Sequence, residues 1–172
     1  LLMQDLQNRD WGTMIVDIEN MTWSPIHVTQ RLQDQQNSYD RTVLIGSSAG
    51  CLKPGNVVTY RWLGGEMSTL KLQERVYEGV TGVVSLDNTL VIGDYFKVWS
   101  DEVFTVEIDL PEDTFGEIVM AENIGLESEA NLPEILGFDP DASRKRIADL
   151  AYCAAQHGAT RIEKILDKSV ND

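Results

Sequence analysis

Residues 46–50 read Gly-Ser-Ser-Ala-Gly, the pattern G-x-S-x-G with Ser48 at its centre. Serine hydrolases hold the nucleophile in such a turn, between a strand and the helix that follows it. Here Pro54 and Gly55 follow closely and would interrupt a helix, so a turn between two strands explains the pattern better. His157 and several aspartates would supply a base and an orienting acid by chain order alone. A serine hydrolase acting through Ser48 therefore ranks third, behind two binding functions described below. We expect that the protein is not an enzyme.

A cluster of aromatic residues is the second candidate for chemistry. Tyr95, Phe96, Trp99 and Phe104 lie within ten residues of one another. Tyrosine and tryptophan combine an apolar body with a polar tip, which suits sugar rings or the headgroup layer of a membrane. Packing in a protein core is the ordinary alternative, but a strand here would put Tyr95 and Trp99 on the opposite face from Phe96. We therefore expect some of these rings to be exposed, and predict that Tyr95, Phe96 and Trp99 contact a ligand or membrane.

Acidic side chains dominate the charge of the chain, with 28 Asp and Glu against 14 Lys and Arg and a formal net charge of −14. Such a surface repels phosphate backbones, so we expect no nucleic-acid partner. Residues 98–143 contain 13 of the acids and no Lys or Arg. A solvated acidic face is the ordinary explanation of such a run. The alternative is a surface for a basic protein partner, with Asp101, Glu102, Glu112 and Asp113 as its candidate residues.

Metal and cofactor sites have little support in the sequence. The histidines are His27 and His157, and the cysteines are Cys51 and Cys153. None of them forms the paired spacing of a zinc site. We therefore predict no metal and no cofactor. A bridge between the two cysteines stays open, although free thiols are favoured because the chain lacks the dense cysteine spacing of a disulfide scaffold.

Short extended segments recur between residues 11 and 125 and predict a mainly β fold. They contain 4–7 residues and are separated by turn signals such as Gly64-Gly65 and Asp87-Asn88. This spacing is typical of an antiparallel β-sandwich. The expected strands are 14–19, 26–29, 42–45, 57–62, 70–73, 79–84, 89–92, 95–99, 103–108 and 117–120, with 30–40 as an exposed loop.

The two ends of the chain are expected to differ from this sandwich. Residues 1–10 form an N-terminal stub, and residues 126–172 form an acidic connector followed by a helical hairpin that packs against the sandwich. Asp139 and Pro140 supply a helix cap and a first helical residue. A second short helix is expected to start at Thr160. No stretch approaches the ~20 apolar residues that a membrane-spanning helix needs.

The order of these features resembles that of the actinoporin-like and aegerolysin-like β-sandwich cytolysins. Residues 14–22 are similar to their first core strand, and the turn at 54–55 leads into a strand as it does there. The resemblance spans about residues 13–108. It implies a β-sandwich whose aromatic stretch, here 95–99, contacts lipid headgroups. Acidic residues in the matching region (Asp94, Asp101 and Glu102) argue against anionic membranes.

Together these features predict a non-enzymatic recognition module that binds a membrane lipid or a cell-surface glycan, in the manner of a cytolysin. The alternative is an acidic protein-interaction or assembly domain of a larger protein. Self-association and the compartment are left open, and a secreted or membrane-surface location is favoured.

Overall fold

The computed structural model describes residues 1–21, 24–35, 39–49, 53–81, 85–111, 136–157 and 165–169. Within these residues, five helices and four strands follow one another along the chain. No described helix combines the length and the apolar character that crossing a bilayer requires. In chain order the elements are α1 (Leu2–Gln7), α2 (Pro25–Gln33), β1 (Arg41–Ala49), β2 (Val57–Trp62), α3 (Thr69–Val80), α4 (Leu86–Tyr95), β3 (Glu102–Leu110), α7 (Pro140–His157) and β4 (Ile165–Lys168).

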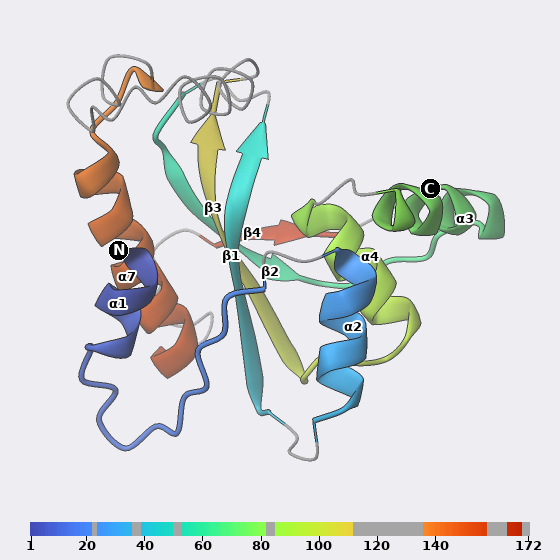
Figure 1. Ribbon diagram of the computed structural model, residues 1–172, viewed down its shortest axis with the longest axis horizontal. Coiled ribbons are helices and arrows are strands. Elements are labelled where there is room, and N and C mark those ends of the chain that lie inside the picture. Colours follow the sequence, from blue (N-terminus) through green and yellow to red (C-terminus); the bar gives the residue numbers. More distant parts are fainter. Residues whose placement is uncertain are drawn as a thin grey trace.

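The four strands form one mixed sheet in the order β1-β3-β2-β4 (Figure 1). β1 runs parallel to β3, with Arg41 opposite Glu102 at the start of the ladder. β2 is antiparallel to β3, and β4 is parallel to β2. Two parallel strands need a crossover connection between them. Between β1 and β3 the chain passes through β2, α3 and α4, and the two helices provide this crossover.

Helices cover both faces of this sheet (Figure 1). On one face, Val106 packs with Leu6 of α1 and with Ile147 of α7. On the other face, Val103 packs with Leu90 of α4 and with neighbouring residues. Because adjacent residues of a strand point to opposite faces, β3 contributes to both cores.

The expected antiparallel β-sandwich is therefore wrong, because the described chain folds into one mixed sheet between two helical layers. Three of the expected strands are present, since 42–45, 57–62 and 103–108 lie within β1, β2 and β3. Residues 14–19 are outside any described strand, and 117–120 are outside the described residues. The sandwich was what the resemblance to cytolysins implied, so cytolysin-like activity stays a prediction without support from the fold.

Five expected strands lie wholly or partly in helices, and a serine begins each of those helices. Ser24 caps α2 by accepting from the backbone N–H of His27 at 3.4 Å, and Pro25 takes the first helical position. Ser68 accepts from Lys71 N in α3, and Ser85 accepts from Asn88 N in α4. These caps satisfy backbone donors that the first helical turn leaves free, and they outweigh the β-propensity of the segments that follow. The misassigned strands are 26–29, 70–73, the first two residues of 79–84, 89–92 and the beginning of 95–99, and the expected loop 30–40 begins inside α2.

The C-terminal region is helical only in part. Asp139 Oδ1 accepts hydrogen bonds from the backbone N–H groups of Asp141 and Ala142, at 2.9 and 3.2 Å, so the predicted cap of α7 is confirmed. The prediction of a second helix in this hairpin is wrong for residues 165–168, because they form strand β4. The proposed boundary near residue 125 lies outside the described residues.

Residues 1–10, expected as a stub, contain α1 and pack against α7. Leu6 is buried, and Arg9 forms an ion pair with Asp149 of α7 at 2.7 Å. The Trp11 indole donates a hydrogen bond to the Leu6 carbonyl at 3.0 Å. These contacts tie the N-terminal segment to the face of the sheet opposite α4.

Candidate functional site

The aromatic cluster lies at the end of α4, where the chain turns toward β3. Tyr95 is the last residue of the helix and Phe96 is its C-cap. Their side chains are 59% and 44% exposed, and their rings meet edge to face with centroids 5.1 Å apart. Two of the three predicted contact residues are thus neighbours on the surface.

The third predicted contact residue, Trp99, turns inward. Its indole N–H donates a hydrogen bond to the Leu90 carbonyl at 2.9 Å. Its ring lies so close to Gly93 that a Cβ there would be 2.3 Å from Trp99 Cζ2. Trp99 therefore fixes the loop before β3 onto α4, and only Tyr95 and Phe96 are well placed for a partner.

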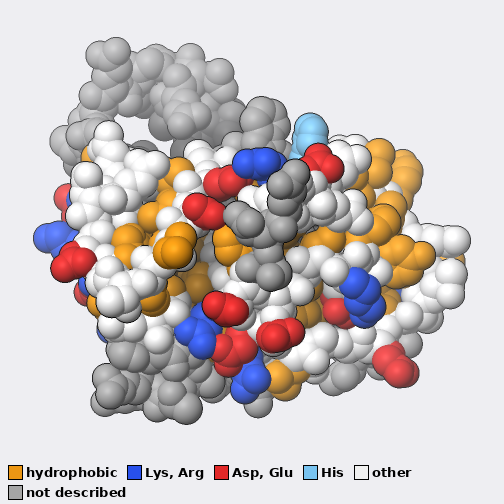
Figure 2. Space-filling view, turned by 90° about the horizontal axis from the view of Figure 1, so that it is seen from below, with side chains coloured by type: hydrophobic (Ala, Val, Ile, Leu, Met, Phe, Trp, Pro, Cys, Tyr) orange, Lys and Arg blue, Asp and Glu red, His pale blue; other side chains and the backbone are white. Residues whose placement is uncertain are grey.

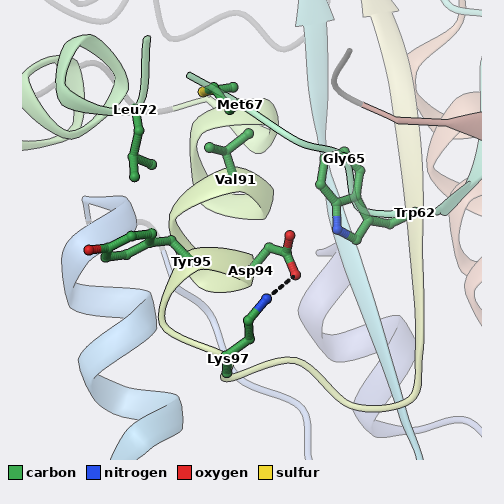
Figure 3. A pocket seen from close by; sticks show the side chains of 8 residues that line it. All are labelled: Trp62, Gly65, Met67, Leu72, Val91, Asp94, Tyr95 and Lys97. Carbon is green, nitrogen blue, oxygen red and sulfur yellow. Dashed lines mark ion pairs between the residues drawn. The ribbon is translucent and has the colours of Figure 1, made fainter. Parts of the chain in front are cut away.

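A hollow of about 160 Å³ opens next to Tyr95 (Figure 3). Tyr95 stands on one side of it and Trp62, the last residue of β2, on the other, with Asp94 between them. The end of β2, the connection to α3, and the helices α3 and α4 supply its walls. The lining residues are Trp62, Gly65, Met67, Leu72, Val91, Asp94, Tyr95 and Lys97.

Besides the Tyr95 hydroxyl, three lining side chains carry polar groups: Asp94, Lys97 and Trp62. Lys97 Nζ lies 3.6 Å from Asp94 Oδ1, and the lysine is the more exposed of the two. Trp62 is only 9% exposed, and its indole N–H has no hydrogen-bond partner among the described residues. Buried polar groups nearly always have a hydrogen-bond partner, so the unpaired indole N–H of Trp62 beside this hollow is exceptional.

The backbone at Lys97 is unusual. Its φ of 56° lies in the left-handed region, which glycine normally occupies at the end of a helix. The N–H of Val98 donates to the Gly93 carbonyl and that of Lys97 to the Asp94 carbonyl, both at 3.1 Å, which is the Schellman arrangement. A lysine thus holds a conformation that favours glycine, at the rim of the hollow, and such strained positions cluster at functional sites.

Further exposed apolar side chains lie on α3, on a different side of the helix from the hollow. Leu70, Tyr77 and Val80 share one side of this helix and are exposed, whereas Leu72 faces the hollow. Figure 2 shows many hydrophobic side chains on the side of the molecule on which α3 lies in Figure 1. Of the eight large hydrophobic side chains that are exposed in the described residues, six belong to this region. We call these six the α3–α4 apolar surface: Leu63, Leu70, Tyr77, Val80, Tyr95 and Phe96.

The acidic candidates do not gather around this surface. Asp101 is exposed at the turn before β3. Glu102 accepts a hydrogen bond from Arg41 Nε at 2.9 Å, and Arg41 also donates to the Ala155 carbonyl. The charge of Glu102 is therefore already balanced by Arg41. Glu112 and Asp113 lie outside the described residues, and a partner-binding role for all four stays a prediction.

Ser48 lies inside β1, which continues to Ala49, rather than in the expected turn. Its hydroxyl donates a hydrogen bond to Asp109 Oδ1 at 3.0 Å. A hydrolase needs a histidine between the serine and the acid, whereas here the acid accepts from the serine directly. His27 lies on α2, and the side chain of His157 is outside the described residues. Ser48 is therefore a strand residue paired with its neighbour on β3, and not a nucleophile exposed between a strand and a helix.

Metal-ligating side chains do not cluster in the described part of the chain, where no group of three or more His, Cys, Asp or Glu is close enough to hold an ion. Cys153 is a free thiol on α7. Cys51 lies outside the described residues.

A second polar cluster, which the sequence did not indicate, pins β4 to the sheet. Lys168 Nζ lies 2.9 Å from Glu107 Oε1 and 2.6 Å from Asp87 Oδ1. Glu107 is buried and also accepts from the Thr105 hydroxyl at 2.6 Å. Burial lowers the pKa of Lys168, but the hydrogen bonds to Asp87 and Glu107 outweigh it, so the pKa is raised above its usual value. Every charged group in this cluster has a partner, which fits a role in holding the fold.

Comparison of the chain with protein-family models, with curated proteins and with solved structures gave no match. The geometry of the α3–α4 apolar surface and its hollow therefore carries the functional argument.

Of the residues in this site, the sequence indicated Tyr95 and Phe96 but not the others. Leu70, Tyr77 and Val80 share a face only if 69–80 is a helix, and the cap at Ser68 was the signal for that helix. Trp62 and Asp94 are far apart in the sequence and meet only because α4 packs against the end of β2. No local pattern would have paired them.

Proposed function

We propose that this chain is a non-enzymatic recognition module that binds a basic, amphipathic segment of a partner protein at the α3–α4 apolar surface. The observation that carries this proposal is the concentration of exposed hydrophobic side chains on one helical layer. Large exposed apolar patches mark binding sites in soluble proteins, whereas hydrophobic side chains exposed singly are ordinary. Tyrosine is also among the residues that most often dominate interface energetics.

The charge of the chain favours a basic partner. A net charge of −14 attracts positively charged segments and repels acidic ones and nucleic acids. Apolar contacts on α3 would supply most of the affinity, and the long-range attraction would mainly raise the association rate. Binding should therefore weaken between about 0.05 M and about 0.5 M salt without vanishing.

The hollow supports binding rather than catalysis. Its lining offers apolar side chains, one ion pair and one indole N–H, a set that suits the anchor residue of a partner. Lipids and glycans, which the aromatic cluster first suggested, are the competing ligands that an experiment must separate from a protein.

Selection of peptides from a random displayed library against the whole chain tests this proposal. We expect the selected peptides to be basic, with apolar residues at helical spacing. Tyr77→Glu should weaken their binding about tenfold or more, because it places a charge in the apolar surface. Ile15→Glu is the matched control, since Ile15 is 97% exposed and lies outside this surface, and it should leave the affinity unchanged.

Two results would overturn the proposal. One is selection of peptides whose affinity does not distinguish Tyr77→Glu from Ile15→Glu. The other is recruitment of the chain to phosphatidylcholine vesicles, lost on Tyr77→Glu, without any peptide selected at this surface.

A further inference from the structure

The indole N–H of Trp62 has no acceptor among the residues that the structure describes. Its nitrogen is buried. A buried donor left unpaired destabilises a fold, because it has lost its hydrogen bonds to water. The nitrogen is closed to a water-sized molecule as the ring stands, and Trp62 lines the hollow, so a group that enters the hollow can accept from it after a small turn of the ring.

An acceptor stands across the hollow from this donor. Figure 3 shows the nitrogen edge of Trp62 turned toward the Asp94 carboxylate. One carboxylate oxygen of Asp94 faces Lys97, whereas Oδ2 lies 3.8 Å from the place that a Cβ on Gly64 would occupy. A ligand atom between Trp62 and Asp94 would have to accept a hydrogen bond from one and donate to the other. A hydroxyl group does both.

The size of the hollow and its other lining residues indicate which chemical group carries this hydroxyl. The hollow measures about 160 Å³, and an apolar cavity of ~150 Å³ is large enough to hold a benzene ring. Met67, Leu72 and Val91 are apolar, and the Tyr95 ring flanks the opening. Aromatic rings pack favourably against such walls and against one another.

We propose that the hollow is a socket for the phenol ring of a tyrosine in the partner segment, with its hydroxyl bridging Trp62 Nε1 and the Asp94 carboxylate. This inference rests on the proposed function and names the anchor residue of the partner. A phenylalanine would fill the same space but leave the Trp62 N–H unpaired, and an aliphatic side chain would leave both polar groups unpaired.

Binding of p-cresol and of toluene to the whole chain tests the socket. Both molecules fit the hollow, and only p-cresol carries the hydroxyl. The readout is the indole N–H resonance of Trp62 in a ¹H–¹⁵N spectrum, assigned by its loss in Trp62→Phe. We expect p-cresol to shift this resonance and to bind about fivefold more tightly than toluene, as one hydrogen bond of ~1 kcal/mol predicts.

Variants at the two polar groups provide the controls. Asp94→Ala should remove the preference for p-cresol, so that this variant binds p-cresol and toluene with equal affinity. Trp62→Phe should do the same, and Asp94→Ala keeps the test decisive if the tryptophan variant is unstable. Equal affinities for p-cresol and toluene in the unmodified chain would overturn the hydroxyl bridge, and so would a Trp62 resonance that neither molecule moves.

The outcomes separate this inference from the proposed function. If basic peptides bind in a Tyr77-dependent manner but p-cresol does not shift Trp62, the socket is wrong and the recognition surface stands. If p-cresol binds as described but no peptide is selected at the α3–α4 apolar surface, the socket stands and the protein partner is wrong.

Discussion

The indole ring of Trp99 lies against Gly93 of α4. Its N–H donates a hydrogen bond to the carbonyl of Leu90, about one helical turn before Gly93. Any Cβ on Gly93 would stand 2.3 Å from Cζ2 of this ring, well inside van der Waals contact. The glycine lets the loop before β3 pack flat on α4. This packing positions Tyr95 and Phe96, which follow shortly after Gly93.

Gly93→Ala should therefore destabilise the protein by about 2 kcal/mol, because the extra methyl overpacks the Trp99 ring. The sign is diagnostic, since glycine to alanine inside a helix otherwise stabilises by up to about 1 kcal/mol. Urea unfolding followed by circular dichroism measures the change. Gly79→Ala in α3 is the matched control: its Cβ would meet the tip of Ile92 at 3.1 Å and Pro25 at an ordinary 3.7 Å, so it should cost much less. Equal stability of the two variants would contradict the packing of Trp99.

Lys97→Gly should stabilise the protein by about 1 kcal/mol, because glycine adopts the left-handed conformation without the steric penalty of a side chain. Lys97→Ala is the control, since it removes the ammonium group but retains the Cβ, and it should not stabilise. The ion pair with Asp94 is exposed and adds little. Urea midpoints of the two variants would show the difference, and a Lys97→Gly variant no more stable than Lys97→Ala would refute the backbone argument.

Lys168→Met should cost about 3 kcal/mol, because it leaves the buried Glu107 carboxylate without its cation. Adding Glu107→Gln should recover part of this loss, since the buried charge is then removed as well. The free energies of unfolding of the two single variants, the double variant and the parent give the coupling between the residues. Independent, additive losses would argue against the pairing of Lys168 with Glu107.

The stabilisation from Lys168 should also depend on pH. Because the folded pKa of Lys168 is raised above its ordinary value of 10.5, its contribution is complete below about pH 10 and is lost as the pH rises through the folded pKa. Burial, followed by the charge of Glu107, raises the pKa of Tyr60, whose ring lies under Lys168, so the measurement belongs in a Tyr60→Phe background. In that background, the loss of unfolding free energy caused by Lys168→Met should be constant from about pH 7 to about pH 10 and should then shrink. A loss that already shrinks near neutral pH would contradict the assignment.

The parts of the fold that could be predicted from sequence are those with a local signal that matches the final structure. The apolar runs at 42–45, 57–62 and 103–108 are strands as predicted, and Asp139 with Pro140 marks the start of α7. The helices α2 and α4 were missed because their sequences are rich in β-branched residues. α4 is buried on nearly all sides, so it shows no polar face at helical spacing.

The candidate site was predictable only where its residues are neighbours in the chain. Tyr95 and Phe96 stood out as a pair of rings, whereas the socket depends on Trp62 from the end of β2 and Asp94 from α4. Trp99 belonged to the same aromatic cluster, but its hydrogen bond to Leu90 and its contact with Gly93 turn it inward. Side-chain direction of this kind follows from tertiary packing and not from composition.

Hydrogen–deuterium exchange of the whole chain, with and without a selected basic peptide, tests the recognition surface most directly. The account predicts slower exchange in α3 (Thr69–Val80) and α4 (Leu86–Tyr95), with α7 (Pro140–His157) unchanged. Protection confined to α1 and α7, on the opposite face of the sheet, would contradict it.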